Sequence, residues 1–262
     1  MNRRGRERRS RPRPAPVELR TPFALAEVNA DPFRPAARTL VLDGREAGQV
    51  DVGDPRRLAF AYMRRIADLI DVFRPAGAGI DALHIGGGAF ALPRYLAATR
   101  PASRSEVYEL DPGVVQLARA HLGLRPAPRL RVRIGDAAQL LPARPDRSAD
   151  LVIGDAFDGP HVPAQLSGPG FAAEVRRVLR PAGVYALNVI DVPPLEEARE
   201  LSAAVTAVFA HVVWVAPPGV LRGRAPGNVV LLASGVPLPM AALQRAAAAA
   251  VPREQVLVPT AR

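Results

Sequence analysis

The sequence predicts an α/β fold. We expect a doubly wound, Rossmann-like sheet that is mostly parallel, has an antiparallel edge strand and is preceded by a small N-terminal β-hairpin unit. From residue 82 onward, short apolar runs alternate with helical segments, which is the pattern of parallel strands joined by helical crossovers. The last two runs are joined by a loop rich in proline and glycine that is too short for a crossover helix. Residues 17–56 instead contain short strand-like runs separated by turn residues.

The chain of 262 residues is long enough for one large domain with a small appendage. We expect a disordered Arg- and Pro-rich tail over residues 1–16, a β subdomain over 17–56 and a Rossmann-like domain over 57–262. The net charge is +10, and residues 1–20 alone hold eight arginines and two glutamates. Most of the basicity therefore lies in a segment without apolar periodicity, which favours a solvated leader over a specific nucleic-acid surface.

Composition excludes several kinds of chemistry. The chain has no cysteine, so disulfides, thiolate zinc sites and cysteine nucleophiles are ruled out. All 35 basic residues are arginine, which excludes a P-loop lysine and a Schiff base. The four histidines are too scattered for a metal motif, and we expect no metal. The apolar stretch 203–221 is interrupted by His211 and two prolines, so we expect a soluble, cytoplasmic protein without a membrane span.

The N-terminal elements follow from turn and helix signals. The apolar run 40–42 ends at Asp43 and Gly44, a pair typical of tight hairpins. Residues 49–52 alternate before the turn that begins at Gly53. A helix is predicted over about 56–73, because its apolar residues recur at helical spacing.

The remaining elements alternate in type along the chain. The helices are expected over 90–99, 112–121, 168–179 and 195–209. The strands are expected over 82–85, 106–110, 130–134, 150–154, 184–190, 212–216 and 228–233.

Acidic residues stand at or just after the ends of three of these strands in succession. In a doubly wound sheet, ligands bind beyond the carboxyl ends of the strands. Glu109 comes 23 residues after Gly86, about where an acid grips ribose hydroxyls. Each acid alone is more often a helix cap or a solvated turn. Together they indicate a ligand site; its acidic members are Glu109, Asp111, Asp136, Asp155 and Asp158.

Residues 86–91 also satisfy the loose G-x-G-x-x-A dinucleotide pattern, which is the competing interpretation. A pyrophosphate is disfavoured beside an acidic rim, whereas a sulfonium or an amine is favoured there.

Five motifs, together with an upstream Leu42-Asp43-Gly44 hairpin and Tyr62, resemble the spermidine synthase-like (polyamine aminopropyltransferase) family. That family lies within the class I S-adenosylmethionine-dependent methyltransferase-fold superfamily. The resemblance covers about residues 38–235. The motifs are Ile85-Gly86-Gly87-Gly88, Glu109-Leu110-Asp111-Pro112, Gly135-Asp136-Ala137, Asp155-Ala156-Phe157-Asp158 and Leu179-Arg180-Pro181-Ala182-Gly183-Val184.

The resemblance implies transfer of an aminopropyl group from decarboxylated S-adenosylmethionine to an amine, with release of methylthioadenosine. A free amine is mostly protonated at pH 7, so it must lose a proton before it attacks. The resemblance assigns that proton to Asp155 and the placement of the amine to Tyr62. Asp158 would pair with an ammonium, and His161 and Gln49 would line the acceptor pocket.

The resemblance also implies a donor site. Gly86 and Gly88 would line the nucleoside, Glu109 would bind the ribose, and Asp136 would bind the adenine amine. Asp111 and Ala137, which adjoin these positions in the motifs, belong to the same predicted cofactor site. The donor would act as a co-substrate, either decarboxylated S-adenosylmethionine or S-adenosylmethionine itself.

The sequence departs from the family pattern at three positions. Ala89 stands where an acid usually follows the glycine triplet, and Arg64 stands where a glutamate usually follows the gate tyrosine. Gln49 lies two residues further along than the hairpin glutamine. An arginine in place of an acid repels a diamine, so we expect putrescine to be a poor acceptor.

Two other functions remain open at this point. One is a small-molecule methyltransferase that uses S-adenosylmethionine, which the missing acid at position 89 favours. The other is a non-catalytic member that binds a nucleoside. For the transferase we expect a small-molecule amine as partner, a homodimer, no membrane and no specific nucleic acid.

Overall fold

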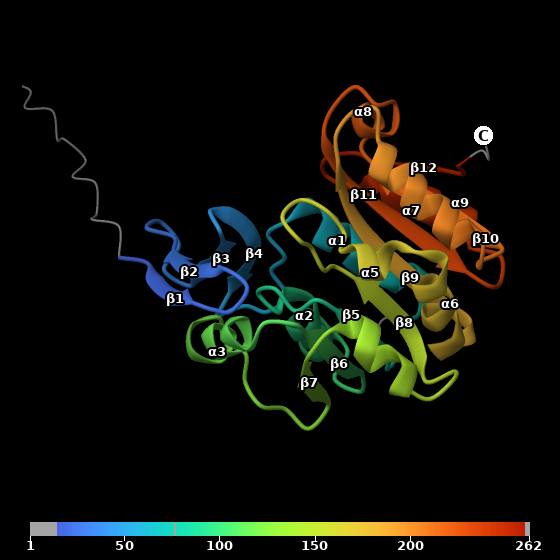
Figure 1. Ribbon diagram of the computed structural model, residues 1–262. Helices are drawn as coiled ribbons and strands as arrows, with labels where there is room; N and C mark the ends of the chain where they lie inside the picture. The colour runs from blue at the N-terminus through green and yellow to red at the C-terminus, as the bar shows by residue number, and fades with distance from the viewer. Residues whose placement is uncertain (1–14, 76, 260–262) are drawn as a thin grey trace, which may run out of the picture.

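The computed structural model describes residues 15–75 and 77–259 as two β-sheets with helices packed around them (Figure 1). Residues 1–14, which make up most of the tail predicted to be disordered, lie outside the described residues. The smaller sheet has four strands in the order β1-β2-β3-β4, and the larger has eight in the order β12-β10-β11-β9-β8-β5-β6-β7. In the described ranges, no helix is long and apolar enough to cross a membrane.

The N-terminal sheet is antiparallel throughout, as its turn residues predict. Asp43 and Gly44 both have positive φ, 46° and 77°, and connect β3 to β4 in a tight hairpin. A register shift in the β3–β4 pairing leaves Ala47 as an extra residue in β4. The strands are β1 (Val17–Arg20), β2 (Leu25–Ala30), β3 (Ala37–Leu42) and β4 (Arg45–Asp51).

The large sheet is parallel over five neighbouring strands and antiparallel beyond them. β9 pairs with β8 in parallel and with β11 in antiparallel orientation, and β10 and β11 form the predicted antiparallel hairpin. The sequence did not predict β12, which adds three residues to the edge of β10. The strands are β5 (Asp81–Ile85), β6 (Arg104–Glu109), β7 (Leu130–Ile134), β8 (Ala149–Gly154), β9 (Leu179–Asp191), β10 (His211–Ala216), β11 (Gly227–Ser234) and β12 (Gln255–Leu257).

The first helix starts later than predicted, at Ala61 rather than near residue 56. The reason is that Leu58 forms a β-bridge with Val50, which holds the segment before the helix in an extended conformation. The helices are α1 (Ala61–Phe73), α2 (Ala91–Thr99), α3 (Pro112–His121), α4 (Ala137–Leu140), α5 (Ala164–Ser167), α6 (Pro169–Val178), α7 (Glu196–Thr206), α8 (Pro218–Leu221) and α9 (Met240–Ala249).

Two apolar clusters fill the space on either side of the large sheet. One joins α1, α2 and α3 to the N-terminal sheet, and the other joins α6 and α7 to the strands. The strands at the centre of the sheet contribute to both clusters through alternating side chains. This arrangement brings the carboxyl ends of β5 and β6 next to the N-terminal sheet, where Gly48 of β4 packs closely against Ala89.

Candidate active site

Two side chains that the sequence singled out meet at the centre of the candidate site. Asp155 follows the last residue of β8, and Tyr62 lies in the first turn of α1, 93 residues earlier. The Tyr62 hydroxyl donates a hydrogen bond to Asp155 Oδ2 at 2.8 Å. The tyrosine is 7% exposed, so its ring is held by packing while its hydroxyl reaches the carboxylate.

The second oxygen of Asp155 is held by a residue that sequence reasoning missed. Asn188, in β9, donates from Nδ2 to Asp155 Oδ1 at 2.8 Å. Its own Oδ1 accepts from Nδ2 of Asn228 on β11 at 3.0 Å, which fixes the orientation of the Asn188 amide. The signal that could have found Asn188 is an amide inside an otherwise apolar strand, which must have a partner when buried.

Burial and hydrogen bonding act on the pKa of Asp155 in opposite directions. Burial is the larger effect and raises the pKa to about 6, while the hydrogen bonds from Asn188 and Tyr62 lower it. The pKa of Tyr62 is raised well above its ordinary value by burial and by the adjacent Asp155 charge. The pair therefore combines a neutral phenol with a carboxylate that can exchange a proton near neutral pH.

The glycine triplet 86–88 allows the loop after β5 to pass close to the backbone of Asp155. Gly86 has a φ of +89°, and a Cβ there would stand 2.4 Å from the carbonyl oxygen of Asp155. Gly88 has a φ of +48°, and a Cβ there would stand 3.0 Å from the carbonyl oxygen of Ala47 in the N-terminal sheet. The loop thus passes between Asp155 and the N-terminal sheet, and positions 86 and 88 have no room for a side chain.

Glu109, at the end of β6, contacts the same loop directly. Its Oε2 accepts from the backbone N–H groups of Gly87 at 2.8 Å and Gly88 at 3.3 Å, and its Oε1 accepts from the N–H of Asp111 at 2.9 Å. Burial raises the pKa of Glu109, and these three hydrogen bonds oppose that effect. The residue is 8% exposed, so its carboxylate is rigidly placed beside the glycines.

The next two predicted donor-site acids cap helices. Asp111 Oδ1 accepts from the N–H of Gly113 at the start of α3, and its Oδ2 accepts from the Thr21 hydroxyl at 2.5 Å. Asp136 Oδ1 accepts from the N–H of Ala138 at the start of α4. Ala137 is 7% exposed in the first position of that helix. Asp111 is therefore held on both oxygens by the protein, whereas Asp136 keeps one oxygen without a partner among the described residues.

The predicted acceptor residues after β8 lie further out. Asp158 and His161 exchange two backbone hydrogen bonds and form a small turn, in which the Asp158 side chain is exposed. The His161 ring nitrogen Nδ1 lies 2.7 Å from Glu197 Oε2 on α7, and the side chain is 70% exposed. His161 thus anchors the turn to α7 rather than meeting the Asp155–Tyr62 pair.

Gln49 is not brought to the pair. It donates to the Thr39 hydroxyl across the β3–β4 ladder at 2.9 Å. Gly48 and Val50 on either side of it are buried, so alternation along β4 puts Gln49 on the opposite face. The side-chain contact of Gln49 is thus with Thr39 and not with Asp155 or Tyr62, and its role in the acceptor pocket stays a prediction.

The two positions that depart from the family pattern also have other contacts. Arg64 donates from Nη1 to the carbonyl oxygens of Leu58 and Ala59, before the start of α1. On a helix it lies about 200° around the axis from Tyr62. Ala89 is 1% exposed and packed against Gly48.

Comparisons with known proteins find polyamine aminopropyltransferases and spermidine synthases, together with methyltransferases. No protein-family model matches the sequence. The chain is 29% identical over 212 residues to a polyamine aminopropyltransferase of Vibrio vulnificus, which covers 79% of this chain and 67% of that protein. It is 35% identical over 153 residues to spermidine synthase 1 of Pisum sativum, covering 56% of this chain and 43% of that protein. Its fold matches the crystal structure of "a probable spermidine synthase" from Corynebacterium glutamicum with a TM-score of 0.86 and 28% identity, over 94% of this chain and 91% of that one.

Proposed function

We infer that this chain, which belongs to the spermidine synthase (polyamine aminopropyltransferase) family within the S-adenosylmethionine-dependent methyltransferase-fold superfamily, is a transferase that moves an aminopropyl group from decarboxylated S-adenosylmethionine to an amine. The observation that carries this proposal is the Asp155 carboxylate, held on one oxygen by Tyr62 and on the other by Asn188. Such a carboxylate beside a nucleoside-binding loop is suited to activating an amine.

The reaction requires an amine lone pair. The amine nitrogen forms a bond to the donor methylene carbon next to the sulfonium, the carbon–sulfur bond breaks, and its electron pair leaves with methylthioadenosine. The proton lost by the amine goes to Asp155, whose pKa of about 6 leaves it ionised at neutral pH. Tyr62, with its pKa raised, keeps its proton and orients the carboxylate.

The donor would lie over the glycine loop. Glu109 is placed to accept from ribose hydroxyls, as an acid at this point of a doubly wound sheet does. Asp136, at the end of β7, has one carboxylate oxygen available for an adenine amine among the described contacts. We propose these roles from their positions at the strand ends together with the family membership.

The acceptor is proposed to be an amine with one well-bound ammonium end. Asp158 is exposed at the rim and can attract that end. Neither Arg64 nor Ala89 supplies a second acid, so a diamine such as putrescine lacks the attraction for its far end.

The test is incubation with decarboxylated S-adenosylmethionine or with S-adenosylmethionine, together with putrescine and other amines. Mass detection then identifies methylthioadenosine or adenosylhomocysteine. We expect methylthioadenosine from the decarboxylated donor, and a loss of about 10²–10⁴-fold in kcat for Asp155→Asn. Asp146→Asn, at an exposed residue paired with Arg177, is the matched control and should retain activity. Formation of adenosylhomocysteine alone would replace this proposal with the methyltransferase.

A further inference from the structure

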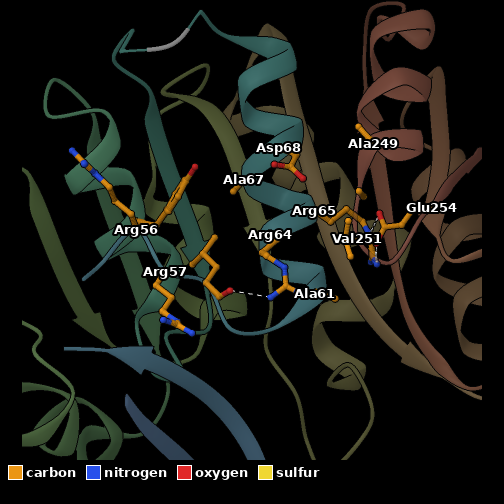
Figure 2. A pocket seen from close by; sticks show the side chains of 13 residues that line it. Arg56, Arg57, Ala61, Arg64, Arg65, Ala67, Asp68, Ala249, Val251 and Glu254 are labelled. Carbon is orange, nitrogen blue, oxygen red and sulfur yellow. Dashed lines mark hydrogen bonds and ion pairs between the residues drawn. The ribbon is translucent and has the colours of Figure 1, made fainter. Parts of the chain in front are cut away.

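The outer side of α1 borders a hollow whose lining residues do not include Asp155 or Tyr62 (Figure 2). Its volume is about 470 Å³, which lies within the range of small-molecule sites. The walls are α1, the loop before it, Tyr95 of α2, and the segment after α9. Tyr62 is not among the residues that line this hollow, and its hydroxyl contacts Asp155 instead.

Four arginines and two acids line the hollow. Arg65 and Glu254 are paired with each other, with side chains only 3% and 2% exposed, so their charges offset one another. Figure 2 shows this pair turned toward the segment after α9. The charged residues that remain are Arg56, Arg57 and Arg64 against Asp68, which leaves the hollow positive.

Two of these arginines, Arg57 and Arg64, have N–H donors without a partner among the described residues. The Arg57 side chain has no hydrogen-bond partner or ion-pair partner within residues 15–75 and 77–259. Arg64 is fixed through its Nη1, which donates to the carbonyl oxygens of Leu58 and Ala59, and its Nε and Nη2 have no partner in the same ranges. A guanidinium anchored in this way presents its remaining N–H groups in a fixed fork that fits the oxygens of a phosphate.

Two further features of α1 point to an anion. The helix begins at Ala61, which lines the hollow, without a side-chain cap and without an acid in its first turn. Its positive end is therefore uncompensated on this side. Arg65 is 4% exposed, and its Nη1 is a buried donor without an acceptor among the described residues.

We propose that this hollow binds a small molecule that carries phosphate groups, at a site whose lining includes neither Asp155 nor Tyr62. A single phosphate would fill only a fraction of the volume, so the fit is to a pyrophosphate or to a phosphate ester. Arg57 and Arg64 bind the anion, and Asp68 opposes it. This site does not depend on the identity of the amine acceptor.

Isothermal titration of the full chain with pyrophosphate, and separately with inorganic phosphate, tests this site at constant ionic strength. We expect saturable pyrophosphate binding that Arg57→Gln weakens by about tenfold or more, as loss of a charge-assisted hydrogen bond predicts. Arg64→Gln should weaken it similarly, and Asp68→Asn should strengthen it. Tighter binding of inorganic phosphate than of pyrophosphate would overturn the assignment to a larger ligand.

The matched control is Arg45→Gln, at an exposed arginine in the N-terminal sheet. It should bind pyrophosphate like the unmodified chain. An equal loss in this control would show general attraction of a basic protein for polyanions and overturn the proposal. Normal pyrophosphate binding by both Arg57→Gln and Arg64→Gln, with unchanged melting temperatures, would overturn it as well.

Discussion

At the scale of single residues, two opposing effects determine the pKa of the Asp155 carboxyl group. Burial favours its protonated form, and the donors on Asn188 and Tyr62 favour its charged form. As the pH falls through about 6, the folded protein protonates this group before an unfolded chain would. The raised pKa therefore favours the folded state at low pH, and this contribution is lost as the pH rises from about 4 to about 6. Catalysis needs the opposite, ionised form.

The pH dependence of kcat/KM therefore depends on Asn188. For the unmodified chain we expect activity to fall below pH 6, by about tenfold for each further pH unit. Asn188→Ala removes a donor to the charged form, so the acid limb should move to higher pH. Activity at neutral pH should fall by about tenfold or more.

Asn228→Ala is the comparison for this prediction, because Asn228 donates to Asn188 and not to Asp155. It should move the acid limb by less. If Asn188→Ala lowered the melting temperature and left the pH profile in place, the role of Asn188 would be structural only.

At the scale of elements, the closest approach in the site is between the β5–α2 loop and the end of β8. Gly86→Ala should destabilise the protein by roughly 1–3 kcal/mol from backbone strain alone. Contact with the Asp155 carbonyl should add to this cost, because the new Cβ would be 2.4 Å from that oxygen. Chemical denaturation measures the sum, and activity should fall as Asp155 moves.

Gly44→Ala separates the two causes. Gly44 has a similar φ of +77°, but a Cβ there would meet nothing within 4 Å. The loss of stability in Gly44→Ala should therefore come from backbone strain alone. Equal costs for the two variants would show that the crowding at Gly86 has no energetic weight.

The packing of Gly48 in β4 against Ala89 determines the expected effect of a substitution at position 89. The family pattern suggests that Ala89→Asp, combined with Arg64→Glu, would improve putrescine turnover. Ala89 is 1% exposed against Gly48, so an aspartate there would be a buried carboxylate in a tight space. We expect Ala89→Asp to lower the melting temperature and not to raise turnover, whereas Ala89→Ser should be milder. A stable and faster Ala89→Asp variant would favour the family pattern over the packing argument.

The elements of the parallel sheet were largely predictable, because apolar runs and glycines mark the strands and their carboxyl ends. The start of α1 was predicted too early, since the bridge between Leu58 and Val50 is a contact between segments that local periodicity does not record. β12 was missed because three residues carry too little pattern. In the site, the meeting of Tyr62 and Asp155 came from the family resemblance, whereas Asn188 and Asn228 depend on an antiparallel register between β9 and β11.

At the scale of the whole molecule, α1 is tied to the end of the chain by a buried ion pair. Arg65 and Glu254 are 189 residues apart and almost fully enclosed. Glu254→Gln should destabilise the protein by about 3–5 kcal/mol, because it leaves the Arg65 charge buried without a partner. Asp31→Asn removes one charge of the more exposed pair with Arg34 and should destabilise the protein far less than Glu254→Gln. Urea unfolding of both variants measures the difference, and similar costs would contradict the assignment of Arg65 as a buried charge.

The order of strands in the large sheet has a consequence for how the protein is made. β11 inserts between β9 and β10, so the residue that fixes Asn188 arrives 40 positions after it during synthesis. When the ribosome has translated β9, the chain already contains Tyr62 and Asp155. Asn228, whose amide orients Asn188, has not yet been synthesised. Because domains fold as units while the chain emerges from its N-terminus, the carboxylate gains its final orientation only after β11 is translated. We expect a polypeptide truncated before that point to carry every predicted acid but to lack the Asn228 amide that orients Asn188.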